Sequence, residues 1–313
     1  MPTSTPFAAI FRSCESSWGP EVVAEAPAAR LHQWLVQPGH PAGISARRPD
    51  DLSSAPGDRA ATDAAVASQI AELADLQDRL WGEARQSLLV VLQGIDAAGK
   101  DGTIKHVFRG VNPQGVRVSS FKVPTPVEAA HDFLWRVHRQ TPLDGEIGIF
   151  NRSHYEDVLV VRVHELVPEK VWRARYGDIV AFEQMLHRGR TTIVKLFLHI
   201  SYEEQGRRLA ERLEQPDKRW KLQRSDFLER THWADYQAAY EEALTRTSTD
   251  DAPWYVVPAE HKWFRNWVVI EILLHTLRAM DPRYPKAAPA EDFSGLPGVP
   301  PDAHRPGSSE PGR

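Results

Sequence analysis

The sequence predicts an α/β protein in which a parallel β-sheet is covered by helices on both faces. Short runs rich in Val, Ile and Leu alternate with longer amphipathic segments along most of the chain, which is the pattern of β–α–β units. The first apolar run leads into a glycine-bounded loop that ends in Lys100 and precedes a helical segment. A strand, a loop of this kind and a helix are the layout of a phosphate-binding P-loop.

The first elements flank this loop. Residues 62–84 carry apolar side chains at three- and four-residue steps and predict an amphipathic helix beside the first strand. Residues 87–92 suit a strand buried on both faces, and residues 101–108 the helix after the loop. We predict further strands at 116–123, 145–150, 191–200 and 254–257, and further helices at 127–139, about 156–166, 176–188 and 261–280. The closing helix is apolar enough to be either core or a subunit interface.

One main domain is expected, with additions at both ends. Residues 1–56 are punctuated by Pro, Gly, Ser and Ala and predict a partly irregular N-terminal arm. Residues 57–281 form the P-loop domain, and residues 282–313, rich in Pro, Gly and Ser, a disordered tail. With 313 residues and 42% hydrophobic content, the chain can bury a substantial single core.

Composition argues against several classes of protein. The formal net charge of −4 gives no global basic field, so nucleic-acid binding is not expected. A single Cys, Cys14, excludes an intrachain disulfide framework and a thiolate metal cluster. No apolar run approaches the roughly 20 residues of a membrane span, and the N-terminus lacks the signal-peptide pattern. We therefore expect a cytoplasmic protein that binds neither nucleic acid nor membranes.

The P-loop is the candidate phosphate and nucleotide site. Its glycines let backbone N–H groups turn toward an anion, the following helix N-terminus adds partial positive charge, and Lys100 supplies a full charge. The alternative is a structural turn whose lysine is solvated. The residues assigned to this site are Gly94, Ala97, Ala98, Gly99, Lys100, Asp101, Gly102 and Thr103.

Two carboxylates depart from the common P-loop pattern. Asp101 stands where Ser or Thr usually follows the lysine. Asp96 lies inside the loop, where it would repel phosphate unless a cation lay between them. The simplest resolution is that Asp96 holds Mg²⁺, with Mn²⁺ as the alternative ion. The other interpretation is a loop carboxylate that accepts backbone hydrogen bonds.

Polar residues also follow the third strand. Because ligands gather at the carboxyl ends of the strands in such a sheet, Arg152 could clamp a phosphate, and Glu156 or Asp157 could bind metal or orient a substrate. The alternative is a helix start, with Ser153 as N-cap and Glu156 completing a capping box. The two interpretations are compatible, because a cap leaves Asn151 and Arg152 free.

Residues 201–240 are strongly charged and break the alternation, as an insert between the fourth and fifth strands would. In phosphoryl-transfer folds such an insert often closes as a lid that brings arginines over the transferring phosphate. A solvated helical hairpin is the alternative. The basic residues of this segment are Arg207, Arg208, Arg212, Lys218, Arg219, Lys221, Arg224 and Arg230.

Together these segments resemble the polyphosphate kinase 2 family, from about residue 64 to 280. Six motifs in order carry the resemblance: residues 94–102, 131–136, 150–157, 204–209, 220–221 and 253–259. The resemblance implies a three-layer α/β/α P-loop kinase-like fold with a helical lid. It also implies reversible, Mg²⁺-dependent transfer of a terminal phosphoryl group between inorganic polyphosphate and a nucleotide.

The same resemblance implies roles for single residues. Asp96 becomes a magnesium-binding or acceptor-orienting carboxylate, Lys100 and Arg152 phosphate ligands, and Arg208 the lid arginine. Many family members have Asp where Asn151 stands, which removes one possible metal carboxylate here. The resulting catalytic set is Asp96, Lys100, Asn151, Arg152, Glu156 and Arg208.

The expected partners follow from this resemblance. Asn151 with Glu156 resembles the subgroup, class III, that phosphorylates both nucleoside mono- and diphosphates, so AMP and ADP are expected acceptors. ATP is then the product, guanine nucleotides are further candidates, and a homo-oligomer (dimer or tetramer) is expected. Polyphosphate should lie in a channel lined by basic groups, for which the candidates are Lys105, Arg109, Lys122 and Arg136, with Arg117 and Arg139. Scattered surface charges are the alternative.

Two other functions are weighed against this one. An ordinary ATP-dependent kinase of the same fold, acting on a nucleotide or another small molecule, would show Ser or Thr after Lys100, which is absent. A nucleotide-binding regulator without turnover would be favoured by loss of Lys100 or Asp96, and both are present. Fold analogy alone would not separate these functions.

Overall fold

The computed structural model of the protein describes residues 31–217, 219–221, 223–286 and 297. In this part of the chain one sheet has the strand order β1-β6-β5-β2-β4-β3. Its strands are β1 (Leu35–Val36), β2 (Ser87–Gln93), β3 (Val116–Ser120), β4 (Ile147–Asn151), β5 (Thr191–His199) and β6 (Trp254–Pro258). Strands β2 to β6 are parallel, and β1 pairs antiparallel with β6.

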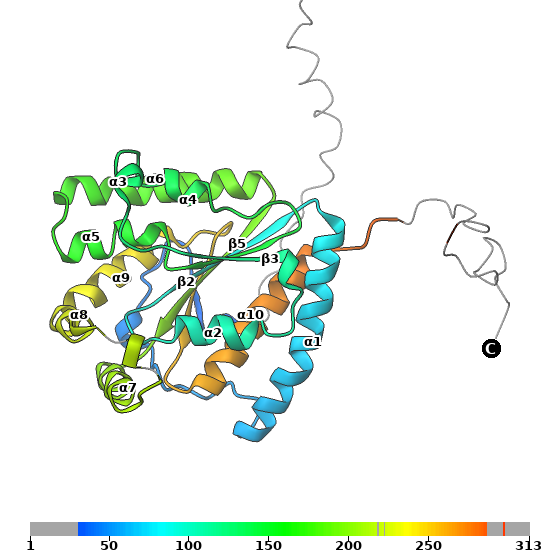
Figure 1. Ribbon diagram of the computed structural model, residues 1–313, viewed down its shortest axis with the longest axis horizontal. Coiled ribbons are helices and arrows are strands. Elements are labelled where there is room, and N and C mark those ends of the chain that lie inside the picture. The colour runs from blue at the N-terminus through cyan, green and yellow to red at the C-terminus, as the bar shows by residue number, and fades with distance from the viewer. Residues whose placement is uncertain (1–30, 218, 222, 287–296, 298–313) are drawn as a thin grey trace, which may run out of the picture.

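Helices lie on both faces of the sheet, which confirms the predicted three-layer α/β/α arrangement (Figure 1). One face carries α1 (Arg59–Glu83), α2 (Lys100–Val107) and α10 (Lys262–Met280). The opposite face carries α5 (Val160–Val163), α6 (Glu169–Arg188) and α9 (Trp233–Thr247). The charged segment 201–240 contains α7 (Tyr202–Glu214), η5 (Arg219–Lys221), α8 (Arg224–Leu228), η6 (Glu229–His232) and the start of α9.

The core lies on both faces of the central strands. All seven residues of β2 are buried, as its branched apolar sequence predicts for a strand between two neighbours. In α10, Trp267, Val268 and Ile270 are each at most 1% exposed within this chain. These apolar residues of the closing helix are therefore core, which decides the question that the sequence left open.

The segment before α1 packs on the domain from residue 31 onward. Trp34 and Val36 are buried, and the Glu241 carboxylate accepts hydrogen bonds from the backbone N–H groups of Gly43 and Ile44, at 2.8 and 2.7 Å. This segment also contains the 3₁₀ helix η2 (Ile44–Ala46). The predictions for residues 1–30, 287–296 and 298–313, and for Lys218, lie outside the described residues.

Two predicted helices are shorter than expected. The helix expected at 127–139 is divided into α3 (Pro126–Ala129) and α4 (Trp135–His138), because the Asp132 carboxylate accepts the Leu134 N–H, at 3.0 Å. The helix expected at 156–166 is the 3₁₀ helix η4 (His154–Asp157) followed by the single turn of α5. Each predicted helix is therefore two short helical segments joined by turns.

Two other boundaries also differ. Helix α6 begins at Glu169 rather than 176, because Trp172 continues the buried face of Tyr176 and Ile179 toward the N-terminus. Strand β3 ends at Ser120 rather than 123 and follows the 3₁₀ helix η3 (Pro113–Gly115). In the described part of the chain no helix is long and apolar enough to cross a membrane.

Candidate active site

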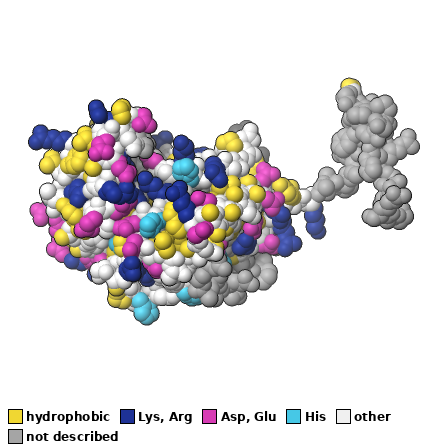
Figure 2. All heavy atoms as spheres, turned by 90° about the horizontal axis from the view of Figure 1, so that it is seen from below, with side chains coloured by type: hydrophobic (Ala, Val, Ile, Leu, Met, Phe, Trp, Pro, Cys, Tyr) yellow, Lys and Arg dark blue, Asp and Glu magenta, His cyan; other side chains and the backbone are white. Residues whose placement is uncertain are grey.

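A cavity of about 1010 Å³ lies where β2 and β4 end. The P-loop, the residues after β4, and helices α1, α2, α7 and α10 contribute to its wall. Among its lining residues are Asp96, Lys100, Asn151, Arg152 and Arg208, all predicted from the sequence. Figure 2 views the molecule from the side on which α7 lies in Figure 1, and Lys and Arg side chains gather across the middle of that face.

The P-loop has a backbone that requires glycine at two positions. Gly94 and Gly99 have φ angles of 150° and 106°, in a region that L side chains rarely adopt. Ala97 is also left-handed, with φ of 66°, and such a conformation in a residue with a Cβ costs about 1–3 kcal/mol. Gly99 is the N-cap of α2, so the first N–H groups of that helix, which a helix does not pair within itself, lie in the loop.

Lys100 is buried at the base of the loop. Its Nζ donates to the carbonyl oxygens of Gly94, at 2.6 Å, and Ile95, at 3.3 Å. Burial, together with the nearby charge of Arg152, lowers the pKa of the Lys100 ammonium to about 8. The lysine therefore faces the loop's own carbonyl groups and loses its proton at a much lower pH than an exposed lysine.

Arg152 links the two loops of the site. Its backbone is left-handed, with φ of 62°, and its N–H donates to Leu92 O at 3.0 Å. Its guanidinium lies 2.5 Å from Asp96 Oδ1 and 3.7 Å from Glu156 Oε2. Burial opposes its charge, but Glu156 and Asp96 together raise the pKa of Arg152. Burial also raises the pKa of Glu156.

The remaining groups after β4 have separate roles. Asn151 Nδ2 donates to Asp101 Oδ1 at 2.8 Å. The residue that differs from the common P-loop pattern, Asp101, therefore contacts the residue at the end of β4 that differs from many family members, Asn151. Ser153 caps η4 by accepting the Tyr155 N–H, at 3.2 Å. Glu156 lies toward Arg152 rather than completing a capping box.

Arg208 is 4% exposed, and acceptors surround its guanidinium. Its Nε donates to Glu204 Oε1 at 2.5 Å, and its two Nη atoms donate to four carbonyl oxygens at 2.5 to 3.0 Å. Those carbonyls belong to Ala97, Ala98, Ala259 and Glu260. All five N–H groups of Arg208 are therefore used, and the side chain holds the P-loop against α7 and the start of α10.

Some of the residues predicted to bind polyphosphate line the cavity, and others do not. Arg109 and Lys122 line the cavity. Arg136 is buried, and its guanidinium donates to the Lys122 carbonyl oxygen at 2.7 Å. The candidates outside the cavity wall are Arg136, Lys105, Arg117 and Arg139.

Several lining residues were not predicted as ligands from the sequence. They include a group at the start of α10, namely Lys262, Trp263, Arg265 and Asn266. Arg212 on α7, which also lines the cavity, was named from the sequence among the basic residues of the lid. Because α10 begins just after the carboxyl end of β6, the strand-end rule could have indicated this group. The apolar sequence of the rest of the helix directed attention to the core instead.

A smaller recess lies beside the cavity. It is lined by Trp233, Tyr236 and Tyr240 of α9 and by Glu156, and it holds about 30 Å³. Asp96 and Arg152 line both this recess and the large cavity. The ion pair therefore stands between a basic compartment and an aromatic one.

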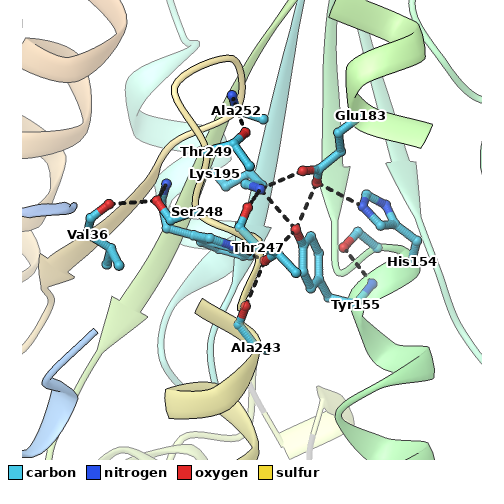
Figure 3. Close-up of polar contacts among 12 residues, drawn as sticks. Val36, His154, Tyr155, Glu183, Lys195, Ala243, Thr247, Ser248, Thr249 and Ala252 are labelled. Carbon is cyan, nitrogen blue, oxygen red and sulfur yellow. Dashed lines mark hydrogen bonds and ion pairs between the residues drawn. The ribbon is translucent and has the colours of Figure 1, made fainter. Parts of the chain in front are cut away.

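A buried polar network supports the loop after β4 (Figure 3). Lys195 Nζ, on β5, donates to Glu183 Oε2 at 2.6 Å, Tyr155 Oη at 3.0 Å and Thr247 O at 2.6 Å. The ring of His154 lies 3.2 Å from Glu183 Oε1. Burial opposes the charge of Glu183, but Lys195 and His154 outweigh it and lower the pKa of the carboxyl. The network joins the Arg152 loop to α6, β5 and the end of α9.

The site has a donor set suited to a divalent metal. No group of three or more His, Cys, Asp and Glu side chains placed to hold a metal is found among the described residues. Mg²⁺, however, is usually held by one or two carboxylates with substrate phosphates and water. Asp96 and Asp101 both line the cavity near Lys100, so the residues present fit such an ion. Phosphotransferases built in this way generally use a divalent metal.

Comparison with known proteins points to one family. The sequence model described as Polyphosphate kinase 2 (PPK2) matches residues 57–285. An AMP/ADP-polyphosphate phosphotransferase from Meiothermus ruber is 52% identical over 262 residues, which are 84% of this chain and 98% of that protein. An ADP-polyphosphate phosphotransferase from Rhodopseudomonas palustris is 45% identical over 71% of this chain and 81% of its own length.

A solved structure is similar in fold as well. The crystal structure of polyphosphate kinase 2 from Arthrobacter aurescens TC1 matches with a TM-score of 0.79 and 42% sequence identity. The match covers 84% of this chain and 93% of that one.

Proposed function

The chain belongs to the polyphosphate kinase 2 family, and we propose that it transfers phosphoryl groups reversibly between inorganic polyphosphate and nucleotides, converting AMP to ADP and ADP to ATP. The observation that carries this proposal is the position of the Asp96–Arg152 pair in the walls of both compartments. A phosphoryl group bound there would have the basic cavity on one side and the aromatic recess on the other.

The large cavity is the proposed site of polyphosphate. Lys100 and the N-terminus of α2 attract the phosphate at the P-loop, and Arg109, Lys122 and Arg212 supply further positive charge in the same wall. A volume of about 1010 Å³ accommodates several phosphate groups of an extended chain. This is the expected form of a binding site for a linear polyanion.

The aromatic recess is the proposed site of the nucleotide. Trp233, Tyr236 and Tyr240 offer flat apolar faces of the kind on which a nucleobase packs, and they lie on the part of α9 that belongs to the charged segment 201–240. The recess holds about 30 Å³ in this structure, so a nucleotide would enter when α7 and α8 move outward, as a lid does when it opens. Adenine nucleotides are the proposed acceptors, and guanine nucleotides are further candidates.

The transfer step needs position and charge more than covalent chemistry. Phosphoryl transfer passes through a loose transition state, so aligned oxygens and neutralised charge supply most of the rate. Lys100 and Arg152 neutralise the transferring group, and Asp96 with Asp101 would hold Mg²⁺, or Mn²⁺ in its place. The bound ion would neutralise phosphate charge that the side chains do not reach. Asn151 and Glu156 would orient the acceptor phosphate through Asp101 and Arg152.

The test is ATP formation from AMP, and separately from ADP, with polyphosphate and Mg²⁺ as the other reactants. We expect ATP from both acceptors and none without polyphosphate, a control that also excludes dismutation of ADP. ATP from ADP alone would keep the reaction and overturn the dual-acceptor assignment. No product from either acceptor would favour an ATP-dependent kinase. The sedimentation coefficient of the full chain tests the expected homo-oligomer.

A further inference from the structure

Arg265 is a buried arginine without an acidic partner. It lies in the first turn of α10, is 2% exposed, and within the described residues forms no ion pair with a carboxylate. Its Nε and Nη2 donate to Asn266 Oδ1, at 3.2 and 2.7 Å, and its Nη1 donates to Gly99 O at 3.3 Å. Two of the five N–H groups of the guanidinium therefore have no acceptor in the described part of the chain.

The contrast with Arg208 shows that this is unusual for the site. Both guanidinium groups adjoin Gly99, where an added Cβ would collide with Arg265 Nη1 and lie 3.5 Å from Arg208 Nη1. Arg208 has the carboxylate of Glu204 and four carbonyl groups, whereas Arg265 has one amide oxygen and one long carbonyl bond. Burial, and after it the charge of Arg208, lowers the pKa of Arg265 to about 9.

The acidic residues of the cavity wall do not compensate this charge. Asp96 pairs with Arg152, Asp63 lies 3.6 Å from Arg59, and Glu211 pairs with Arg207. Asp101 accepts from Asn151. A buried cation without a counter-charge is unfavourable by several kcal/mol, so the guanidinium is suited to an anion that enters the cavity.

We propose that Arg265 binds a phosphate group of the polyphosphate chain beside the P-loop, on the side of α10. This inference rests on the proposed function and adds a ligand that no motif indicated. The guanidinium adjoins Gly99 and Gly102 at the start of α2, next to Lys100 in the chain, so lysine and arginine approach the same anion from different helices. The planar fork of arginine matches two phosphate oxygens, which a lysine cannot match.

A purely structural role is the competing explanation. In that case Arg265 would only space α10 from the P-loop through Asn266 and Gly99. The two roles differ in what a substitution changes. Loss of a spacer disturbs binding of both substrates and lowers the melting temperature, whereas loss of a phosphate ligand weakens polyphosphate selectively.

The experiment compares Arg265→Gln and Arg265→Lys with Arg278→Gln in the full chain. Arg278 lies on the same helix, is exposed and pairs with Glu72, so its variant controls for the loss of an arginine from α10. Binding of fluorescently labelled polyphosphate is measured by anisotropy without nucleotide or metal, and KM is measured for polyphosphate and for ADP. Melting temperatures confirm that each variant is folded.

We expect Arg265→Gln to raise the Kd and KM for polyphosphate by about tenfold to 100-fold, as for loss of a charged hydrogen bond. The KM for ADP should change less than about twofold, and Arg265→Lys should recover part of the loss. An unchanged Kd in Arg265→Gln, or an equal rise in both KM values, would overturn the inference.

Two further outcomes are separated by the design. If Arg265→Gln does not fold, Arg265→Lys decides, because loss of a phosphate ligand raises the Kd for polyphosphate selectively, whereas loss of a spacer changes the binding of both substrates. If the natural protein neither binds nor consumes polyphosphate, the proposed function fails. If the natural protein consumes polyphosphate and neither Arg265 variant differs from it in polyphosphate binding, the role of Arg265 is refuted and the proposed function is kept.

Discussion

The carboxylate of Asp96 and the guanidinium of Arg152 lie 2.5 Å apart, although 56 residues separate them in the chain. Asp96 follows β2 and Arg152 follows β4, and these strands are parallel neighbours, so their carboxyl ends bring the two loops together. A divalent cation would compete with Arg152 for Asp96, and a phosphate would compete with Asp96 for Arg152. Binding of metal and phosphate should therefore be mutually favourable.

Substitution of Asp96 tests this relationship. Asp96→Asn keeps the shape of the side chain but removes its charge, so we expect kcat to fall by about 100-fold or more because metal is held poorly. Polyphosphate binding in the absence of metal should not weaken, since Arg152 is released. Rates measured against divalent-metal concentration check this, with Asp75→Asn on α1 as the control. Wild-type metal dependence in Asp96→Asn would remove Asp96 from the metal site.

The pH dependence of the reaction should report Lys100. Its ammonium form attracts phosphate, and this form is lost as pH rises through a pKa of about 8. We therefore expect kcat/KM for polyphosphate to decrease about tenfold per pH unit above that value, because this ratio follows the free enzyme. Lys100→Arg should keep its charge and lack this decrease. A natural enzyme whose kcat/KM stays flat to about pH 10 would contradict the assignment.

Arg208 and Arg212 should behave differently, although both lie on α7. Removing the Arg208 side chain leaves four carbonyl groups without their donor and leaves Glu204 with Arg207 as its arginine partner, so Arg208→Ala should destabilise the fold by about 3–5 kcal/mol. Arg212 lines the cavity, and Arg212→Ala should keep the melting temperature while lowering kcat. Urea unfolding and steady-state kinetics of both variants separate the roles. A stable, slow Arg208→Ala enzyme would instead support Arg208 as the lid arginine.

The network behind the Arg152 loop should show strong coupling. Glu183→Gln leaves Lys195 charged and buried, so we expect a loss of about 3–5 kcal/mol in the free energy of unfolding. The double variant Glu183→Leu with Lys195→Met should lose much less than the sum of its single changes. Urea unfolding of the natural protein, Glu183→Leu, Lys195→Met and the double variant gives this comparison, and additive losses would show that the pair is not coupled.

Asn151 offers a test of acceptor choice. Asn151→Asp places a second carboxylate 2.8 Å from Asp101, where the two repel unless a cation lies between them. We expect a steeper dependence of the rate on metal concentration and a changed ratio of AMP to ADP turnover. Both acceptors are assayed at saturating polyphosphate, with Asn266→Asp as a comparison at another position of the cavity wall. An unchanged ratio would remove Asn151 from acceptor choice.

Much of the fold could be predicted because its signals are local. A branched apolar run, a loop with Gly94 and Gly99, and a lysine at a helix start specify the P-loop within a few residues, and the structure has these elements at the expected places. The single helix predicted at 127–139 is divided into two in the structure, for an equally local reason that hydrophobic periodicity does not detect. There the Asp132 side chain replaces a helical hydrogen bond at one position.

The sequence by itself determined the order of strands and helices, the phosphate loop and the resemblance to a family, because each depends on neighbours in the chain. Only the tertiary structure decided which charges are compensated. Arg208 and Arg265 are both basic residues that follow a strand, yet among the described residues Arg208 has a carboxylate and four carbonyl groups, whereas Arg265 has no carboxylate and too few acceptors. The reason is physical: a buried guanidinium takes its partners from whichever segments the sheet brings beside it, and sequence spacing does not contain that information.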